Sequence, residues 1–267
     1  MAALSLKIDE EDRDSKEVAG YSSWNAFHVL KRYLEPDGDL NMNQAAIQLL
    51  KMLPSEEGKR FNADQPDLFS CVFLEVAEQI PYHHPAQVRF VRLLKRLAAC
   101  DRVQSCYIEE DCTFRYSMFD TKITLREWFP WESAVNMSSF VARTWAAGIF
   151  NGINFAIWVI KDGLEDDYDR EQYYSEFISA AAMWIIYSGQ LLFDEIVQFP
   201  VEITEYKAKA WNTGPLYTGP IIGLERWRFW QKAFSVAVEG VKVDNEGKAN
   251  ALKAANLMDV IARDCMW

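Results

Sequence analysis

Eight of the ten tryptophans of this 267-residue chain lie between Trp128 and Trp230. The segments that carry them have apolar residues at the three- and four-residue spacing of helices, and they contain few side chains suited to acid-base or nucleophilic chemistry. Because indole rings bury large areas in protein interiors, this distribution predicts a wide aromatic core. It does not by itself indicate a reaction centre.

Half of the residues are hydrophobic, so the chain can bury a substantial core without disulfides or structural metals. The formal net charge of -11 argues against nucleic acid as a partner and against an anionic membrane surface, since both are bound by clustered Lys and Arg. The five cysteines are odd in number, and the acidic N-terminal stretch lacks a cationic lead into an apolar run. These features indicate a reduced, cytoplasmic protein.

Helical periodicity extends through most of the chain, and no segment alternates apolar and polar residues long enough to indicate a sheet. We therefore predict an all-α fold, a single multi-helix bundle of about nine helices built from antiparallel helical hairpins. Residues 1–20 lack a consistent period and are expected to form a mobile N-terminal tail, followed by one domain over residues 21–267. Within this domain we expect N-terminal helical pairs over 21–100, a connector over 101–130 and a tryptophan-rich helical half over 131–267.

The helical period is lost near residues 101–126, where β-tending residues such as Val103, Tyr107 and Ile108 are frequent. We expect an irregular connector there, with one short hairpin. The helix predicted over 171–197 is the longest, and its length makes it the expected central axis of the bundle. Its longest apolar stretch, residues 177–193, is interrupted by Ser179, Ser188 and Gln190. It falls short of the roughly 20 residues of a membrane span, so we expect a buried core helix.

Three stretches of the chain resemble a known family. Residues 131–143 read WESAVNMSSFVAR, residues 181–193 read AAMWIIYSGQLLF, and residues 224–230 read LERWRFW. The first is similar to a signature of tryptophan, then Asn-Leu-Asn-Ala-Phe, then Ala-Arg, although Met137, Ser138 and Ser139 replace the family's usual Leu, Asn and Ala. The family consists of uncharacterised all-helical proteins of filamentous ascomycetes (fungi) and is catalogued as a domain of unknown function. The resemblance covers most of the chain from Trp24 onward and implies an all-helical fold and a fungal origin.

Signals for particular chemistry are sparse. The adjacent His83 and His84 lie in a predicted turn, where the two rings cannot easily converge on one ion. The sequence contains no Gly-x-Ser-x-Gly elbow, Walker loop or Gly-x-Gly-x-x-Gly motif. The acidic run over residues 165–169 has approximately the spacing of a terpene-cyclase carboxylate cluster, but its second cluster is incomplete, so we interpret the run as a solvated loop. We therefore predict neither a metal nor a cofactor.

Polar residues on otherwise apolar helix faces are the remaining candidates for a site. We expect them to orient a ligand in a cavity with aromatic walls, because a few convergent polar groups in an apolar pocket are typical of small-molecule sites. The predicted ligand-binding residues are Trp131, Asn136, Arg143, Trp184, Tyr187, Gln190 and Trp227. The alternative is structural: the same polar groups join helices by hydrogen bonds, and Glu225 with Arg226 supplies a buried ion pair that fixes helix register.

Two functional hypotheses follow from these observations. The first is a protein that binds a small hydrophobic metabolite in an aromatic pocket and acts as a cofactor-free cyclase or isomerase of secondary metabolism. The second is a non-catalytic interaction module whose acidic, helical surface binds a protein partner. An enclosed cavity favours the first hypothesis, and a large exposed apolar patch favours the second.

Overall fold

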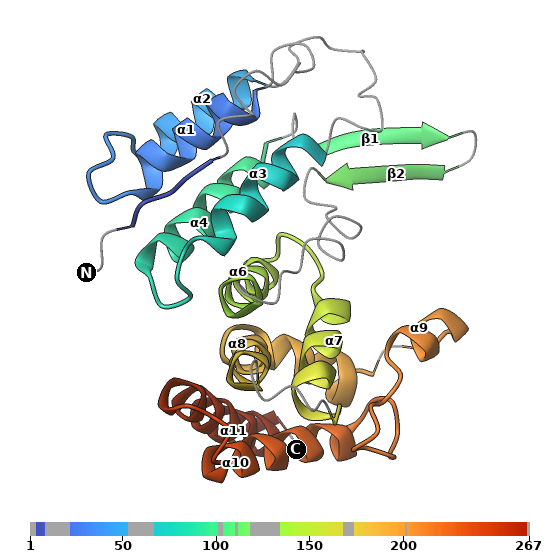
Figure 1. Ribbon diagram of the computed structural model, residues 1–267. Coiled ribbons are helices and arrows are strands. Elements are labelled where there is room, and N and C mark those ends of the chain that lie inside the picture. The colour runs from blue at the N-terminus through green and yellow to red at the C-terminus, as the bar shows by residue number, and fades with distance from the viewer. Residues whose placement is uncertain are drawn as a thin grey trace. The chain divides into compact units, whose positions relative to one another are not determined.

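The computed structural model of the protein is predominantly helical (Figure 1). It describes residues 4–8, 22–52, 67–100, 104–109, 112–117, 134–167, 174–200 and 202–265. This part of the chain contains ten α-helices, one π-helical segment and two strands, so the predicted all-α class is confirmed. The predicted site residue Trp131 and most of the predicted tail, residues 1–3 and 9–20, lie outside the described residues.

Contacts divide the chain into two compact units. Unit 1 comprises Met1–Phe129 and Ala147–Phe150, and unit 2 comprises Pro130–Ala146 and Asn151–Trp267. The division falls close to the boundary that the sequence indicates between the N-terminal helical pairs and the tryptophan-rich half. The expectation that both belong to one domain stays a prediction.

Capping residues set where the first helical pair of unit 1 begins. Helix α1 (Ser23–Leu34) follows Ser22, whose hydroxyl accepts a hydrogen bond from a first-turn backbone N–H. Helix α2 (Met42–Lys51) starts with a reciprocal capping box between Asn41 and Gln44. Each such cap satisfies backbone donors that a helix start otherwise leaves unpaired.

The second pair consists of α3 (Asp67–Glu78) and α4 (Pro85–Ala98). The ring of His84 accepts a hydrogen bond from the backbone N–H of Ala86, and the proline that follows His84 occupies the first turn of α4. His84 is therefore a helix cap. Helix α1 packs against α2, α3 and α4, and α2 packs against α4.

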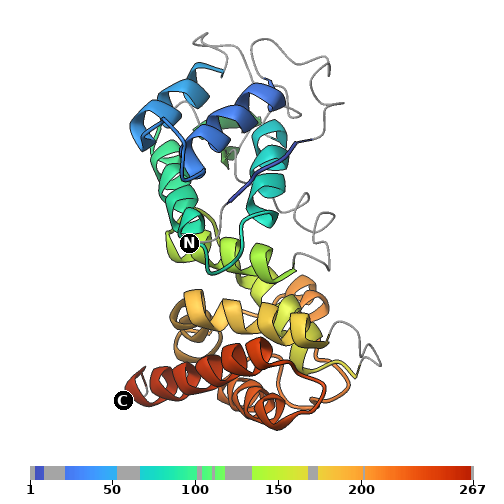
Figure 2. The same cartoon turned by 60° about the vertical axis from the view of Figure 1, so that its left-hand side comes forward.

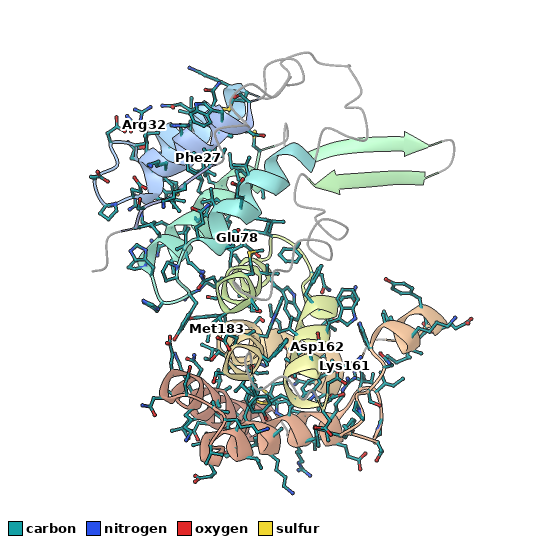
Figure 3. All side chains as sticks on the ribbon, in the orientation of Figure 1. Phe27, Arg32, Glu78, Lys161, Asp162 and Met183 are labelled. Carbon is teal, nitrogen blue, oxygen red and sulfur yellow. The ribbon has the colours of Figure 1, made fainter. Side chains whose placement is uncertain are left out.

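The two faces of α1 differ as its amphipathic sequence requires. Phe27 is 2% exposed and Arg32 is exposed on the other side of the helix (Figure 3). Arg32 forms an ion pair with Asp39 in the turn before α2, with 2.6 Å between Nη2 and Oδ2. The hydrogen bond from Arg32 holds the pKa of the Asp39 carboxyl below its ordinary value.

Residues 4–8 pack against the other residues of unit 1 and do not form part of a mobile tail. The side chain of Leu6 is fully buried, and its backbone N–H donates to Glu35 Oε1 at 2.7 Å. The Gln79 side chain accepts from the backbone N–H of Lys7 and donates to its carbonyl, each at 2.8 Å. The prediction of a mobile tail is wrong for these residues. The apolar residues Leu4 and Leu6 stand in a charged stretch, and the local sequence does not indicate that they pack against residues far along the chain.

The predicted connector contains one antiparallel hairpin. Strand β1 (Gln104–Glu109) pairs with β2 (Cys112–Ser117), with Gln104 opposite Ser117 and Glu109 opposite Cys112. The hairpin expected from the β-tending residues is therefore present, and it forms a two-stranded sheet.

Unit 2 contains the longer helices. They are α6 (Ala134–Ala146), α7 (Ile153–Leu164), α8 (Tyr174–Phe193) with its π-helical continuation η4 (Asp194–Gln198), α9 (Glu205–Ala210), α10 (Leu224–Glu239) and α11 (Asn245–Cys265). The sequence predicts a helical half over 131–267. It gives no separate signal for α9, because the six residues EYKAKA are too few to show an apolar period.

Helix α8 is the central element of unit 2, as its length and apolar composition predict. It packs against α6, α7 and α11, while α10 packs against α11 (Figures 1 and 2). By length and hydropathy the 25-residue helix Tyr174–Gln198 could cross a membrane, but 72% of its most apolar 18-residue stretch is buried inside the protein. Met183, near its middle, is fully buried (Figure 3). These observations confirm the prediction of a core helix.

We predict that Leu6→Ala lowers the free energy of unfolding by about 2–4 kcal/mol, because truncating a fully buried leucine removes transfer energy and leaves a cavity. Urea denaturation followed by circular dichroism measures the change. Lys7→Ala, an exposed side chain whose observed contacts are made by its backbone, is the matched control and should be nearly neutral. Equal stability of the Leu6 variant and the wild type would contradict the docking of residues 4–8.

Candidate functional site

A buried ion pair joins α7 to α10 in unit 2. Glu165 directly follows α7, Arg226 lies in the first turn of α10, and both side chains are 0% exposed. Arg226 Nε lies 2.7 Å from Glu165 Oε1, and Nη2 lies 3.0 Å from Oε2. This fork-to-fork geometry matches the planar guanidinium to the carboxylate.

The remaining acceptor capacity of Glu165 is used by two neighbours. The indole Nε1–H of Trp230 donates to Oε1 at 2.6 Å, and the backbone N–H of Gly214 donates to Oε2 at 2.9 Å. Four donors therefore surround the buried carboxylate, which is the condition under which a charge is tolerated away from water.

Arg226 also holds the loop that precedes its own helix. Its Nη1 donates to the carbonyl of Trp211 at 2.8 Å and to the carbonyl of Ile221 at 2.6 Å. Residues 212–220, which include both Gly-Pro dipeptides, lie between these two anchors. The loop before α10 is thus tied at both ends to the Arg226 guanidinium.

The predicted partner of Arg226 was wrong. Glu225 is exposed, and the carboxylate that pairs with Arg226 belongs to Glu165. Adjacent residues on a helix point about 100° apart, so one cannot pair with the other across a helix interface. The interpretation of the acidic run over 165–169 as solvated is also wrong for Glu165, because its apolar context lies in distant segments of the chain.

Tyr217 packs inside this loop. It is 8% exposed, and its hydroxyl is buried without a hydrogen-bond partner in the described part of the chain. Burial raises the pKa of this hydroxyl above its ordinary value. A β-carbon at Gly219 would overlap the hydroxyl, so glycine permits this close packing.

Two of the predicted ligand-binding residues do meet. The guanidinium of Arg143 on α6 lies over the Tyr187 ring on α8, 3.6 Å from its centroid, and Arg143 Nε donates to Ser139 Oγ at 3.2 Å. Asn136 lies two helical turns before Arg143 on the same side of α6 and is half-buried. The cation-π contact links α6 to α8, whereas the hydrogen bond to Ser139 stays within α6.

The two predicted tryptophans that the structure describes are parts of the core. Trp184 on α8 is fully buried, with its ring centroid 6.3 Å from that of Trp145. Trp227 on α10 is also fully buried, and its Nε1–H donates to the carbonyl of Met258 at 3.2 Å. Its ring meets Phe193 edge-on at 4.9 Å. Trp184 and Trp227 therefore contact different residues.

Gln190 lies on the surface. Its Nε2 donates to Asp194 Oδ1 at 3.0 Å and to Cys265 Sγ at 3.2 Å. The structure therefore joins Arg143 to Tyr187 but distributes Trp184, Trp227 and Gln190 over other contacts. Among the described residues it also contains no group of three His, Cys, Asp or Glu side chains that could hold a metal.

A half-open cavity of about 570 Å³ lies between α2 and α4 in unit 1. Its volume falls within the range of roughly 300–1,000 Å³ that is typical of small-molecule sites. The lining is mostly apolar and consists of Asn43, Ala46, Ile47, Leu50, Arg96, Ala99 and Cys100.

The sequence of α2 explains why apolar surface remains at this cavity. Its apolar residues include Ala45, Ala46, Ile47, Leu49 and Leu50, which together form a face wider than the stripe of roughly 100° that suffices to face a core. Leu49 is buried, whereas Ile47 is 53% exposed. The sequence analysis did not predict this site, and the excess width of the apolar face of α2 was the available signal.

The structure defines an all-helical protein with a buried ionic centre in unit 2 and an apolar cavity in unit 1. The family model described as "Protein of unknown function (DUF3632)" matches residues 71–234, more than half of the chain, and the chain belongs to this family. The match includes Glu165, Arg226 and the α4 side of the cavity, and it does not extend to α2. No curated protein and no solved structure matches the chain.

We predict that Glu165→Gln and Arg226→Gln each lower the free energy of unfolding by about 3–5 kcal/mol, because each leaves the other charge buried and uncompensated. Chemical denaturation followed by tryptophan fluorescence measures the effect.

Glu225→Gln is the matched control, since it makes the same chemical change at an exposed carboxylate beside Arg226. We expect it to change stability by no more than about 0.5 kcal/mol. If the Glu225 and Glu165 variants were equally destabilised, the assignment of the ion pair would be incorrect.

Proposed function

We propose that this protein binds a small, largely apolar molecule in the half-open cavity between α2 and α4. The observation that carries this proposal is the cavity itself, about 570 Å³ in volume and walled on both sides by helices. Apolar concavities of this size with a few polar groups are the usual form of small-molecule sites. This position differs from that of the aromatic pocket that we predicted from the sequence, which stays a prediction.

The composition of the lining favours binding over chemical conversion. None of the seven lining side chains is a carboxylate or an imidazole, the groups that most often transfer protons in enzymes. The proposal is therefore a carrier or sensor of a small molecule, and the cyclase or isomerase activity is not part of it. The alternative of a protein-binding surface stays a prediction from the acidic composition.

A cytoplasmic location and a fungal origin belong to the same proposal. Cys100 and Cys265 are free cysteines, which is consistent with a reducing compartment. The fungal origin rests on the resemblance between the tryptophan-containing stretches and the ascomycete family.

We predict that the neutral fluorophore N-phenyl-1-naphthylamine binds the wild-type protein with increased fluorescence, and that Ile47→Asp weakens this binding about tenfold. The substitution places a charge on the apolar wall, where it must be desolvated when the probe binds. Because Ile47 is 53% exposed, the variant should remain folded. Val236→Asp, at an apolar side chain of unit 2 that is 62% exposed, is the control and should bind like the wild type.

Alkylation of Cys100 locates the bound probe independently. Cys100 lines the cavity and Cys265 does not, although both are partly exposed. We expect saturating probe to slow the reaction of Cys100 with iodoacetamide, measured by peptide mass spectrometry, and to leave Cys265 unchanged. Absence of probe binding, or equal protection of both cysteines, would refute the proposed site.

A further inference from the structure

One charged side chain lines the cavity. Arg96, in the last turn of α4, is exposed to solvent and has neither a hydrogen bond nor an ion pair within the described part of the chain. Its position next to the C-terminal carbonyls of α4 is favourable for a cation, and Lys95 beside it has the same advantage. The helix dipole therefore accounts for positive charge in this turn, and the Arg96 guanidinium in addition borders the apolar wall of the cavity.

The two helices that form the cavity are cationic in an acidic protein. Helices α2 and α4 together contain five Lys and Arg residues and no Asp or Glu, whereas the whole chain has a net charge of -11. The five are Lys51, Arg89, Arg92, Lys95 and Arg96. Of the five, Arg96 lines the cavity, whereas Arg89 donates to the backbone carbonyl of Tyr33 on α1. A positive charge at a concave surface raises the local concentration of anions.

We infer that the ligand of this cavity is an anionic amphiphile, a molecule with a hydrocarbon or aromatic body and one acidic group. This inference rests on the proposed function. The acidic group would pair with the Arg96 guanidinium, which offers a planar fork of donors to carboxylate or phosphate oxygens. The apolar body would cover Ile47 and Leu50.

Other classes of anion fit the cavity less well. A bare inorganic ion would leave the apolar wall formed by Ala46, Ile47, Leu50 and Ala99 in contact with water. A nucleic acid would require cationic side chains spread over a wide surface, and the chain as a whole repels a polyanion. An acidic group combined with an apolar body uses both features of the site.

Displacement of N-phenyl-1-naphthylamine by decanoate, 1-decanol and decyltrimethylammonium tests the inference, since the three compounds share one hydrocarbon chain and differ in head-group charge. For the wild type we expect decanoate to displace the probe at a concentration about fivefold or more below that of decanol, and the cation to be the weakest competitor. In Arg96→Gln the preference for decanoate over decanol should disappear.

Lys95→Gln is the matched control, because it removes the same charge from the adjacent residue, which does not line the cavity. It should keep most of the preference for decanoate, and its far-ultraviolet circular dichroism and that of Arg96→Gln should match the wild type.

If the probe binds and protects Cys100 but decanoate and decanol compete equally, the inference fails while the proposed function stands. If decanoate is preferred but both glutamine variants lose the preference equally, general charge rather than Arg96 is responsible, which overturns the assignment. If the probe does not bind, both proposals fail.

Discussion

The buried pair of Glu165 and Arg226 is the interaction on which the architecture of unit 2 most depends. Each charge would be costly alone in the core, and each is compensated by the other and by donors or acceptors from surrounding segments. One carboxylate and one guanidinium thereby fix the end of α7, the start of α10 and the loop over residues 211–223 relative to each other. Geometry this specific favours a single packing of the aromatic helices around α8.

The same kind of compensation describes several polar groups of the aromatic half, where we predicted a site from the sequence. Arg226 and Trp230 form hydrogen bonds within unit 2, and Arg143 lies on Tyr187. Polar groups engaged in this way determine how helices pack. Arg96 contrasts with them, because it lines a cavity and no described residue pairs with it. Its exposed guanidinium is the group that we propose to pair with the acidic end of a ligand.

The sequence predicted the helices well because their apolar periods and caps are local. The starts of α1, α2 and α4 follow Ser22, Asn41 and His84, and each of these residues caps its helix through its own side chain. The same local patterns do not identify which residues pair with each other across the fold. Nothing local to Arg226 identifies Glu165, 61 residues away, as its partner, and nothing local to Leu6 identifies the helices that bury it.

The candidate site could not be predicted for a related reason. Periodicity identifies which residues of α2 are apolar, but the fraction that neighbours cover depends on how closely α4 approaches. Ile47 is 53% exposed and Leu49 is 1% exposed, yet both belong to the apolar face that the sequence indicates. A cavity is a property of the packed structure, and the excess width of an apolar face is its only trace in the sequence.

The central claim is that a small amphiphile binds between α2 and α4, and hydrogen–deuterium exchange tests it most directly by locating the bound molecule on the chain. With saturating decanoate, the account predicts slower amide exchange in residues 42–51 and 85–98, and unchanged exchange in α6, α8 and α10, because binding suppresses local opening only in the elements that it contacts. Protection concentrated in α8 and α10, or no protection in α2 and α4, would contradict it.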